Sequence, residues 1–139
     1  MQPDLKIQIQ TALKKSISHL QTSLLKVRKI DLDKAGELSE QDLEVLESFS
    51  SRFARSSDIA VSKYFRLLAL EGDPGFRGTV IDLLNLAEKY SWISSAKTWQ
   101  RIREIRNIAA HDYAEDELRL LYKEIVTLAP AVIEVAKKL

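Results

Sequence analysis

Apolar residues recur at steps of three and four along the N-terminal part of the chain, which is the spacing of one face of an α-helix. Asp4 stands just ahead of this stripe as a candidate N-cap, and Lys26, Arg28 and Lys29 follow near its end, where the helix dipole favours positive charge. We therefore predict a first helix with one apolar face. That face consists of Leu5, Ile9, Leu13, Ile17, Leu20, Leu24 and Val27.

A second stripe begins after Gly36, which interrupts the first pattern. Ser39-Glu40-Gln41-Asp42 has the residue types of a capping box, with an acidic residue in the reciprocal position. Because neither glycine nor proline follows before the next turn, we favour one long helix over residues 39–71, with room for a kink. The alternative is that Ser56-Ser57-Asp58 caps a new helix and bends the path. The apolar positions are Leu43, Leu46, Phe49, Phe53, Ala60, Tyr64 and Leu67.

Three shorter helices are predicted after a strong turn signal at Gly72-Asp73-Pro74-Gly75. The first covers roughly residues 77–90, the second is capped by Ser94 or Ser95, and the third begins after Tyr113. Their apolar faces are, in order, Val80, Ile81, Leu84 and Ala87; Trp99, Ile102, Ile105 and Ala109; and Leu118, Leu121, Ile125, Leu128, Val132, Val135 and Leu139.

These stripes together predict an all-α fold, an antiparallel bundle of about five helices in one domain over residues 1–139. The last stripe keeps heptad spacing, and the apolar stripes are long, so we expect a homodimer that buries part of one of them. Pro130 lacks an amide hydrogen, and we expect it to kink or break the last helix near residue 126.

Composition narrows the class of protein further. A formal net charge of +1 argues against a chain-wide grip on nucleic acid, although a local basic patch remains compatible with it. The absence of cysteine from the sequence excludes disulfides and thiolate zinc sites. The N-terminal residues lack a signal-peptide pattern, and no apolar run approaches the ~18 residues of a membrane span. We therefore expect a soluble, cytoplasmic protein that does not insert into a membrane.

The chemistry is concentrated between residues 103 and 113. Arg106 offers a planar fork of donors that matches a phosphate, and His111 has an intrinsic pKa close to neutral. Tyr113 can donate a hydrogen bond to a phosphate oxygen, Asn107 can orient the histidine or the scissile group, and Arg103 adds positive charge. Lys97 and Arg101 add further charge on the same helix.

The spacing sets a condition on this site. Arg106 and His111 are five residues apart, or about 140 degrees around an ideal helix. They converge on one ligand only if the helix loosens or ends near residue 110, and the turn-like Asp112 is consistent with such an end.

RNA fits such a site better than DNA, because RNA carries its own nucleophile in the 2′-hydroxyl group. His111 would take the 2′ proton or protonate the leaving 5′-oxygen, and Arg106 would stabilise charge on phosphorus. We expect neither a metal nor another cofactor, because Asp112, Glu115 and the acidic residues after them already suit a helix N-terminus. The alternative is that His111 only caps a helix and that the chain is a helical interaction domain without catalytic activity.

The segment Arg106-Asn107-Ile108-Ala109-Ala110-His111-Asp112-Tyr113 resembles the Arg-x4-His-x-Tyr signature of HEPN domains, the higher eukaryote and prokaryote nucleotide-binding family. It looks most like the toxin branch that is paired with minimal nucleotidyltransferase antitoxins. The motif covers eight residues, and the helical pattern and late position of the motif agree with the family over most of the chain.

The resemblance implies a helical bundle that dimerises with its two motifs facing each other across a cleft. It implies a metal-independent ribonuclease that cuts tRNA or mRNA, with Arg106 and His111 as the catalytic pair. Tyr113 matches the tyrosine that the nucleotidyltransferase modifies with AMP in some pairs, which would place bulk and negative charge where RNA phosphate must sit. A rival reading within the family is a subunit that binds nucleotides or scaffolds a nucleotidyltransferase without cutting RNA.

Overall fold

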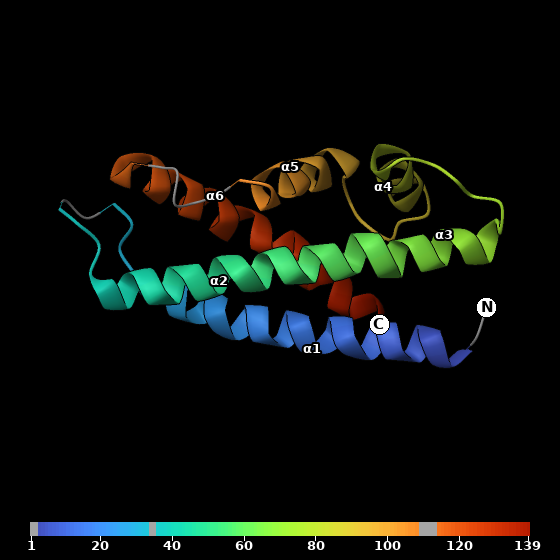
Figure 1. Cartoon of the computed structure of the whole chain (residues 1–139), viewed down its shortest axis with the longest axis horizontal. Coiled ribbons are helices and arrows are strands. Elements are labelled where there is room, and N and C mark those ends of the chain that lie inside the picture. The colour runs from blue at the N-terminus through green and yellow to red at the C-terminus, as the bar shows by residue number, and fades with distance from the viewer. Residues whose placement is uncertain (1–2, 34–35, 109–113) are drawn as a thin grey trace.

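The computed structural model describes residues 3–33, 36–108 and 114–139, and the described residues form helices and contain no strand (Figure 1). The first helix, α1, spans Pro3–Val27. It begins just ahead of the predicted cap, so Asp4 lies in the first helical turn, where its negative charge favours the helix N-terminus. The stripe from Leu13 to Val27 is buried as predicted, whereas Leu5 is exposed.

One continuous helical rod follows. It consists of α2 (Glu40–Ile59), a π-helical segment η1 (Ala60–Phe65) and α3 (Arg66–Gly72), and the residues at both junctions have right-handed helical backbone angles. The predicted single helix over residues 39–71 is thus confirmed. At its start the amide of Asp42 donates a 3.0 Å hydrogen bond to the side-chain oxygen of Ser39, which is one half of the predicted capping box.

The alternative break at Ser56-Ser57-Asp58 is wrong, because α2 continues through these residues to Ile59 and on into η1. Both serines are buried where the rod packs against its neighbours. The hydroxyl groups of Ser56 and Ser16 are 2.8 Å apart and share a hydrogen bond that links the rod to α1. The hydroxyl of Ser57 donates to the carbonyl of Ala54 one turn earlier. Buried polar groups need hydrogen-bond partners, and both hydroxyl groups have one. Because serine is small, the neighbouring helices can also pack closely here.

The third predicted helix begins later than expected. Thr79 and Asp82 form a complete capping box, in which the Asp82 amide donates to the Thr79 hydroxyl and the Thr79 amide donates to the Asp82 carboxylate. This cap fixes α4 at Val80–Lys89 instead of residues 77–90. Its buried residues include Leu83, Leu84 and Ala87.

The last two helices are α5 (Ala96–Arg106) and α6 (Glu115–Glu134), and a short 3₁₀ segment, η3 (Val135–Lys138), continues α6. Ser95 is the N-cap of α5, and it is one of the two serines that the sequence offered for this cap. We expected Pro130 to kink or break the last helix near residue 126, and the break does not occur, since α6 runs through Pro130. Pro130 lies on the exposed side, while Ala129 and Val132 beside it are buried, and their packing offsets the lost hydrogen bond.

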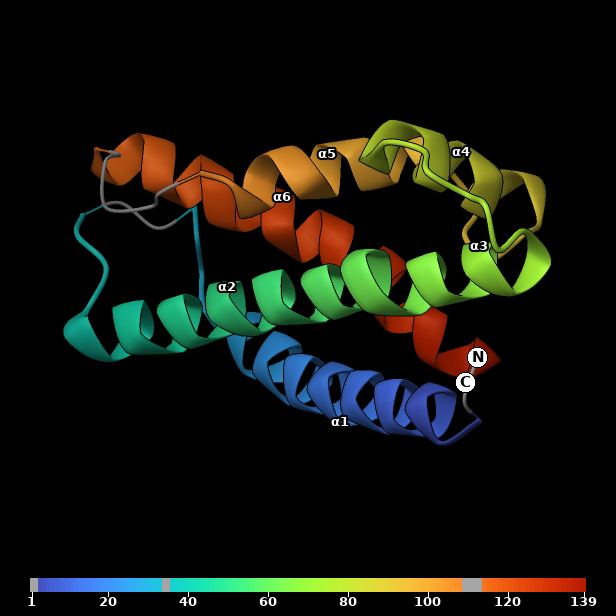
Figure 2. The same cartoon turned by 45° about the vertical axis from the view of Figure 1, so that its right-hand side comes forward.

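The rod is the centre of the bundle. Helix α1 runs antiparallel beside it, and α4 and α5 lie on its other side (Figures 1 and 2). Helix α6 crosses obliquely and packs against α1, α2 and α5. The ring of Phe65, in η1, lies 5.3 Å from the ring of Trp99 on α5 and 6.3 Å from that of Trp92, so an aromatic cluster joins the rod to the α4–α5 layer.

No helix in the described ranges is both long enough and apolar enough to cross a membrane.

Two apolar residues of α4 test which face of the helix is buried. The sequence pattern placed Ile81 in the core, but its side chain is 56% exposed, whereas Leu83 is fully buried. Leu83→Ala should lower the free energy of unfolding by about 2–5 kcal/mol, because it leaves a cavity. Ile81→Ala should change it by less than about 1 kcal/mol. Urea denaturation followed by circular dichroism measures both, and equal losses would contradict the described orientation of α4.

Candidate functional site at the end of α5

Helix α5 ends at the residue that the sequence singles out. Asn107 is its C-cap, with φ −87° and ψ −3°, and its amide donates to the carbonyl of Glu104 at 3.2 Å. The amide of Ile108 donates to the carbonyl of Ile105 at 3.0 Å, so the last turn tightens. The helix thus ends just after Arg106, earlier than the predicted end near residue 110.

This early end meets the condition that the spacing imposed. An ideal helix would hold residues 106 and 111 on different sides, but the helix does not extend that far within the described residues. His111, Tyr113, Ala109 and Asp112 lie outside the described residues. The prediction that Arg106 and His111 meet at one phosphate therefore stays a prediction.

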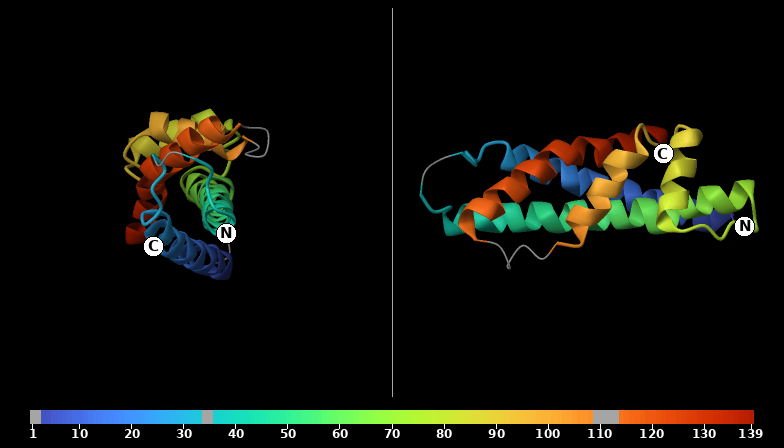
Figure 3. Two further views of the ribbon diagram at one scale, coloured as in Figure 1. Left: turned by 90° about the vertical axis from the view of Figure 1, so that its left-hand side faces the viewer. Right: turned by 90° about the horizontal axis from the view of Figure 1, so that it is seen from above.

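Arg106 is held by a carboxylate that the sequence analysis missed. Its Nε lies 2.9 Å from both carboxylate oxygens of Asp58 on α2, and its Nη2 lies 2.8 Å from Oδ2. Figure 3 shows α5 crossing the rod obliquely. Arg103, one turn earlier on α5, brings Nη1 to 3.2 Å from Oδ1 of the same carboxylate. Asp58 thus gathers two guanidinium groups at the end of α5.

The three side chains remain accessible to solvent. The exposed fractions are 40% for Arg106, 32% for Asp58 and 26% for Arg103. The hydrogen bonds and the charge of Asp58 raise the pKa of Arg106 above its already high value, so the guanidinium stays charged at every physiological pH. Half-exposed ion pairs of this kind contribute at most about 1 kcal/mol each to stability. Their geometry therefore matters more here than their strength.

Arg101 has a different use from the one the sequence suggested. Its Nε and Nη2 bind the two oxygens of Glu124 on α6 at 2.5 and 2.6 Å, and its Nη1 binds Glu104 at 2.9 Å. The guanidinium is therefore engaged in tying α5 to α6. Lys97, at the other end of α5, is exposed.

The start of α6 is clamped against the loop that precedes α2. Glu115 accepts a 2.9 Å hydrogen bond from the amide of Leu38, and Arg119, which is buried, donates to the carbonyls of Leu32 and Gly36. Glu115 also lies 3.6 Å from Arg119. Glu115 lies in the first turn of α6, as predicted. Its bond to Leu38 and the bonds of Arg119 hold the start of α6 against the loop before α2.

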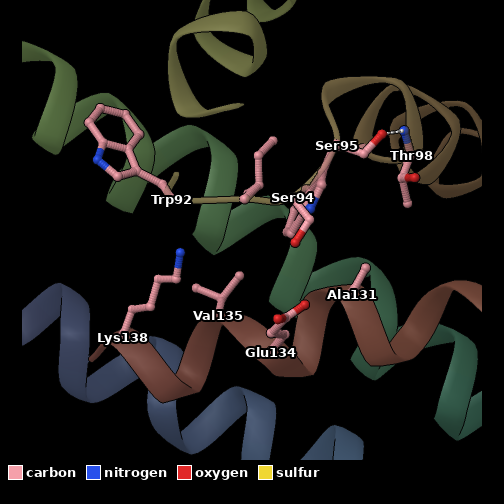
Figure 4. Close-up of a pocket in the computed structure, with 10 residues that line it drawn as sticks. Trp92, Ser94, Ser95, Thr98, Ala131, Glu134, Val135 and Lys138 are labelled. Atoms are coloured by element: carbon pink, nitrogen blue, oxygen red, sulfur yellow. Dashed lines mark hydrogen bonds between the residues drawn. The ribbon is translucent and has the colours of Figure 1, made fainter. Parts of the chain in front are cut away.

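A small, partly enclosed cavity lies at the opposite end of α5 (Figure 4). It has a volume of about 100 Å³, which is room for a few water molecules. Trp92, Ser94 and Thr98 line one side, and Glu134 and Lys138 line the other. Because Ser95 beside it begins α5 and Arg106 ends it, this cavity is separate from the arginine pair.

The Arg101–Glu124 pair gives a test by pH. Hydrogen bonding to Arg101 lowers the pKa of Glu124, so the pair stabilises the fold above the ordinary glutamate pKa of about 4.3, and this contribution is lost as pH falls below it. Glu124→Gln should lower the free energy of unfolding by roughly 0.5–1 kcal/mol at pH 7, and the difference from wild type should shrink at pH 3. Urea denaturation measures both.

Glu44→Gln is the matched control, because Glu44 is exposed on α2 and has no ion pair among the described residues. Glu44→Gln should change the free energy of unfolding only slightly, and by the same amount at pH 7 and pH 3. A Glu124→Gln difference that stays constant from pH 7 to pH 3 would contradict the described pair.

Comparisons of the chain with models of known protein families, with curated proteins and with solved structures find no match. The likeness to HEPN domains therefore rests on the motif at residues 106–113 and on the helical pattern. To this the structure adds an all-α bundle in which Arg106 ends a helix and faces solvent with a defined partner.

Proposed function

We propose that the chain is a metal-independent endoribonuclease, the toxin of a toxin–antitoxin pair, built on a HEPN-like domain that works as a homodimer in the cytoplasm. One observation carries the proposal: a half-exposed, oriented arginine ends α5 directly before the rest of the motif. Arginine at such a position can bind a phosphodiester with two parallel hydrogen bonds. The short motif supplies the proton-transfer group that an arginine lacks.

The proposed reaction needs no outside reagent. The 2′-oxygen of the RNA attacks the adjacent phosphorus and loses its proton, and the bond from phosphorus to the 5′-oxygen breaks as that oxygen gains a proton. His111 carries one of these two proton transfers, and Arg106 stabilises the extra negative charge on phosphorus. The products are a 2′,3′-cyclic phosphate and a 5′-hydroxyl. In a homodimer with facing motifs, the second copy supplies another imidazole.

The remaining site residues hold the substrate in this proposal. Arg103 lies one turn from Arg106 and shares its carboxylate partner, so it adds a second positive charge near the same phosphate. Asn107 is exposed at the end of the helix, where its amide group can reach a ligand. Tyr113 would contact a phosphate oxygen and would be the residue that the partner nucleotidyltransferase modifies.

The first test is cleavage of labelled RNA in the presence of a chelator. Wild type should cut, and His111→Ala and Arg106→Ala should each lower the rate by 10²-fold or more, because general acid–base catalysis and charge stabilisation each contribute on that order. The chain offers matched controls, since His19 is its other histidine and Arg28 is an exposed arginine at the end of α1. His19→Ala and Arg28→Ala should keep wild-type rates. Cleavage that a chelator abolishes would contradict the metal-independent mechanism.

A second test concerns silencing by the partner. Incubation with the cognate minimal nucleotidyltransferase and ATP should add AMP to Tyr113 and stop cleavage, because the adduct is bulky and negatively charged. Intact-protein mass spectrometry and peptide mapping locate the adduct. Tyr113→Phe should take up no AMP, whereas Tyr90→Phe, a change at an exposed tyrosine of the α4–α5 connection, should be modified normally. An inhibited enzyme without an adduct would point to inhibition by complex formation.

The competing function is a subunit that binds nucleotides or scaffolds a nucleotidyltransferase without catalysis. The observation in its favour is that Arg106 already has a carboxylate partner, as an arginine with a structural role would. Binding of RNA or nucleotide without cleavage, under conditions in which the protein is folded and dimeric, would support this function over the nuclease.

A further inference from the structure

Asp58 meets Arg106 along one edge of the guanidinium and not along both. Its carboxylate takes the Nε–H and a donor on Nη2, at 2.9 and 2.8 Å. A guanidinium has five N–H donors in one plane, and the pair formed by Nη1 and the outer hydrogen of Nη2 faces away from the Nε edge. No described residue binds Nη1 of Arg106. The Nη1–Nη2 edge can therefore bind a planar or tetrahedral anion while the Asp58 carboxylate stays bound to the Nε edge.

Asp58 also brings a second arginine to the same point. Arg103 approaches Oδ1 of Asp58 at 3.2 Å, so both guanidinium groups share one carboxylate. Two such cations on adjacent turns of one helix repel each other when nothing lies between them. The carboxylate offsets this repulsion and leaves the three-residue cluster with one net positive charge.

The carboxylate itself is mounted on a rigid element. Asp58 directly follows Ser56 and Ser57, which are buried in the rod and hydrogen-bonded there, and it precedes the buried Ala60. The π-helical segment that starts at Ala60 adds an independent feature, because such segments inside helices recur at functional sites. A group carried on such a packed helix positions its partner more precisely than one on a loop.

We propose that Asp58 is a positioning residue, which holds Arg106 and Arg103 as a preformed cradle for one phosphodiester and turns the outer edge of Arg106 towards it. The identity of the ligand as RNA rests on the proposed function. The orientation of the arginines rests on the distances above.

For the rate of RNA cleavage by Asp58→Asn, a positioning role and simple electrostatics predict opposite changes. Removing a negative charge beside the site should strengthen the attraction of an RNA phosphate, so a purely electrostatic view expects Asp58→Asn to bind and cut RNA better. If Asp58 positions the arginines, Asp58→Asn should instead cut RNA more slowly. A displacement of about 1 Å in a group that stabilises the transition state can lower the rate 10²-fold. Substrate binding should meanwhile stay the same or tighten.

The experiment measures kcat and KM for RNA cleavage by wild type, Asp58→Asn and Asp58→Glu. Asp58→Asn should lower kcat 10- to 100-fold with KM unchanged or lower. Asp58→Glu keeps the charge on a longer side chain and should recover part of the loss. The matched control is Glu71→Gln, since Glu71 lies on the same rod and pairs with Lys6 of another helix at 3.0 Å. That variant should keep wild-type kcat.

A second readout follows the arginine directly. The Arg106 Nε–H signal in nitrogen-15 NMR spectra is assigned by its absence from Arg106→Lys, and urea denaturation confirms that every variant is folded. In wild type this signal should be protected from solvent exchange and should shift on titration with 2′-O-methyl RNA, which cannot be cut. In Asp58→Asn the protection should be lost.

The outcomes separate the two proposals. If wild type cuts RNA and folded Asp58→Asn has an equal or higher kcat, the positioning role is overturned and the nuclease stands. If wild type cuts no RNA, the proposed function falls, and the NMR arm decides on Asp58. A protected Arg106 signal that responds to 2′-O-methyl RNA only when Asp58 is present would uphold the cradle, and an unchanged signal in Asp58→Asn would overturn it.

Discussion

The bundle depends on one constraint, the packing of an uninterrupted helical rod on several sides at once. Residues 40–72 meet α1, α4, α5 and α6, and Ser56, Ser57, Ala60 and Val61 near the middle of the rod are buried. This accounts for the buried serines at 56 and 57, because larger side chains there would hold the neighbouring helices apart. The end of α5 stays exposed, and there Arg106 pairs with Asp58 of the rod.

The three arginines of α5 pair with carboxylates on two other helices, with different consequences. Glu124 neutralises Arg101 and joins α5 to α6, which sets the geometry of the layer. Asp58 takes Arg103 and Arg106 together, which leaves charge at the surface. A near-neutral chain can in this way carry a local positive site. The formal net charge says little about such a site because it sums over groups that already neutralise each other.

Much of the architecture could be predicted from the sequence because its signals are local. The lack of glycine and proline after Gly36 predicts the rod, and Ser39 and Ser95 mark helix starts by their own hydrogen bonds. The errors came from competing local signals or from packing. Ile81 and Leu83 are both apolar, and packing buries Leu83 and leaves Ile81 exposed. The Thr79 cap, which sets the start of α4, was overlooked. Pro130 is tolerated because its neighbours are buried.

The candidate site was predictable only in part. The residue types from Arg106 onward suggested phosphate chemistry, but Asp58 lies 48 positions earlier in the chain and no spacing rule connects the two. In the sequence, Asp58 is noticeable only as part of the possible helix cap Ser56-Ser57-Asp58. A contact of this kind is a property of the packed bundle, and a single sequence without related sequences carries no record of it.

The same sequence distances have a consequence for the order of assembly. The α1–α2 pair is a hairpin of neighbouring segments, whereas the Asp58–Arg106 pair joins residues 48 apart and the Leu38–Glu115 bond joins residues 77 apart. Closing longer loops costs more entropy before any contact is gained. During synthesis Asp58 leaves the ribosome well before the two arginines with which it pairs. A growing chain would therefore carry the carboxylate without its arginines, and the anion cradle would be among the last features to form.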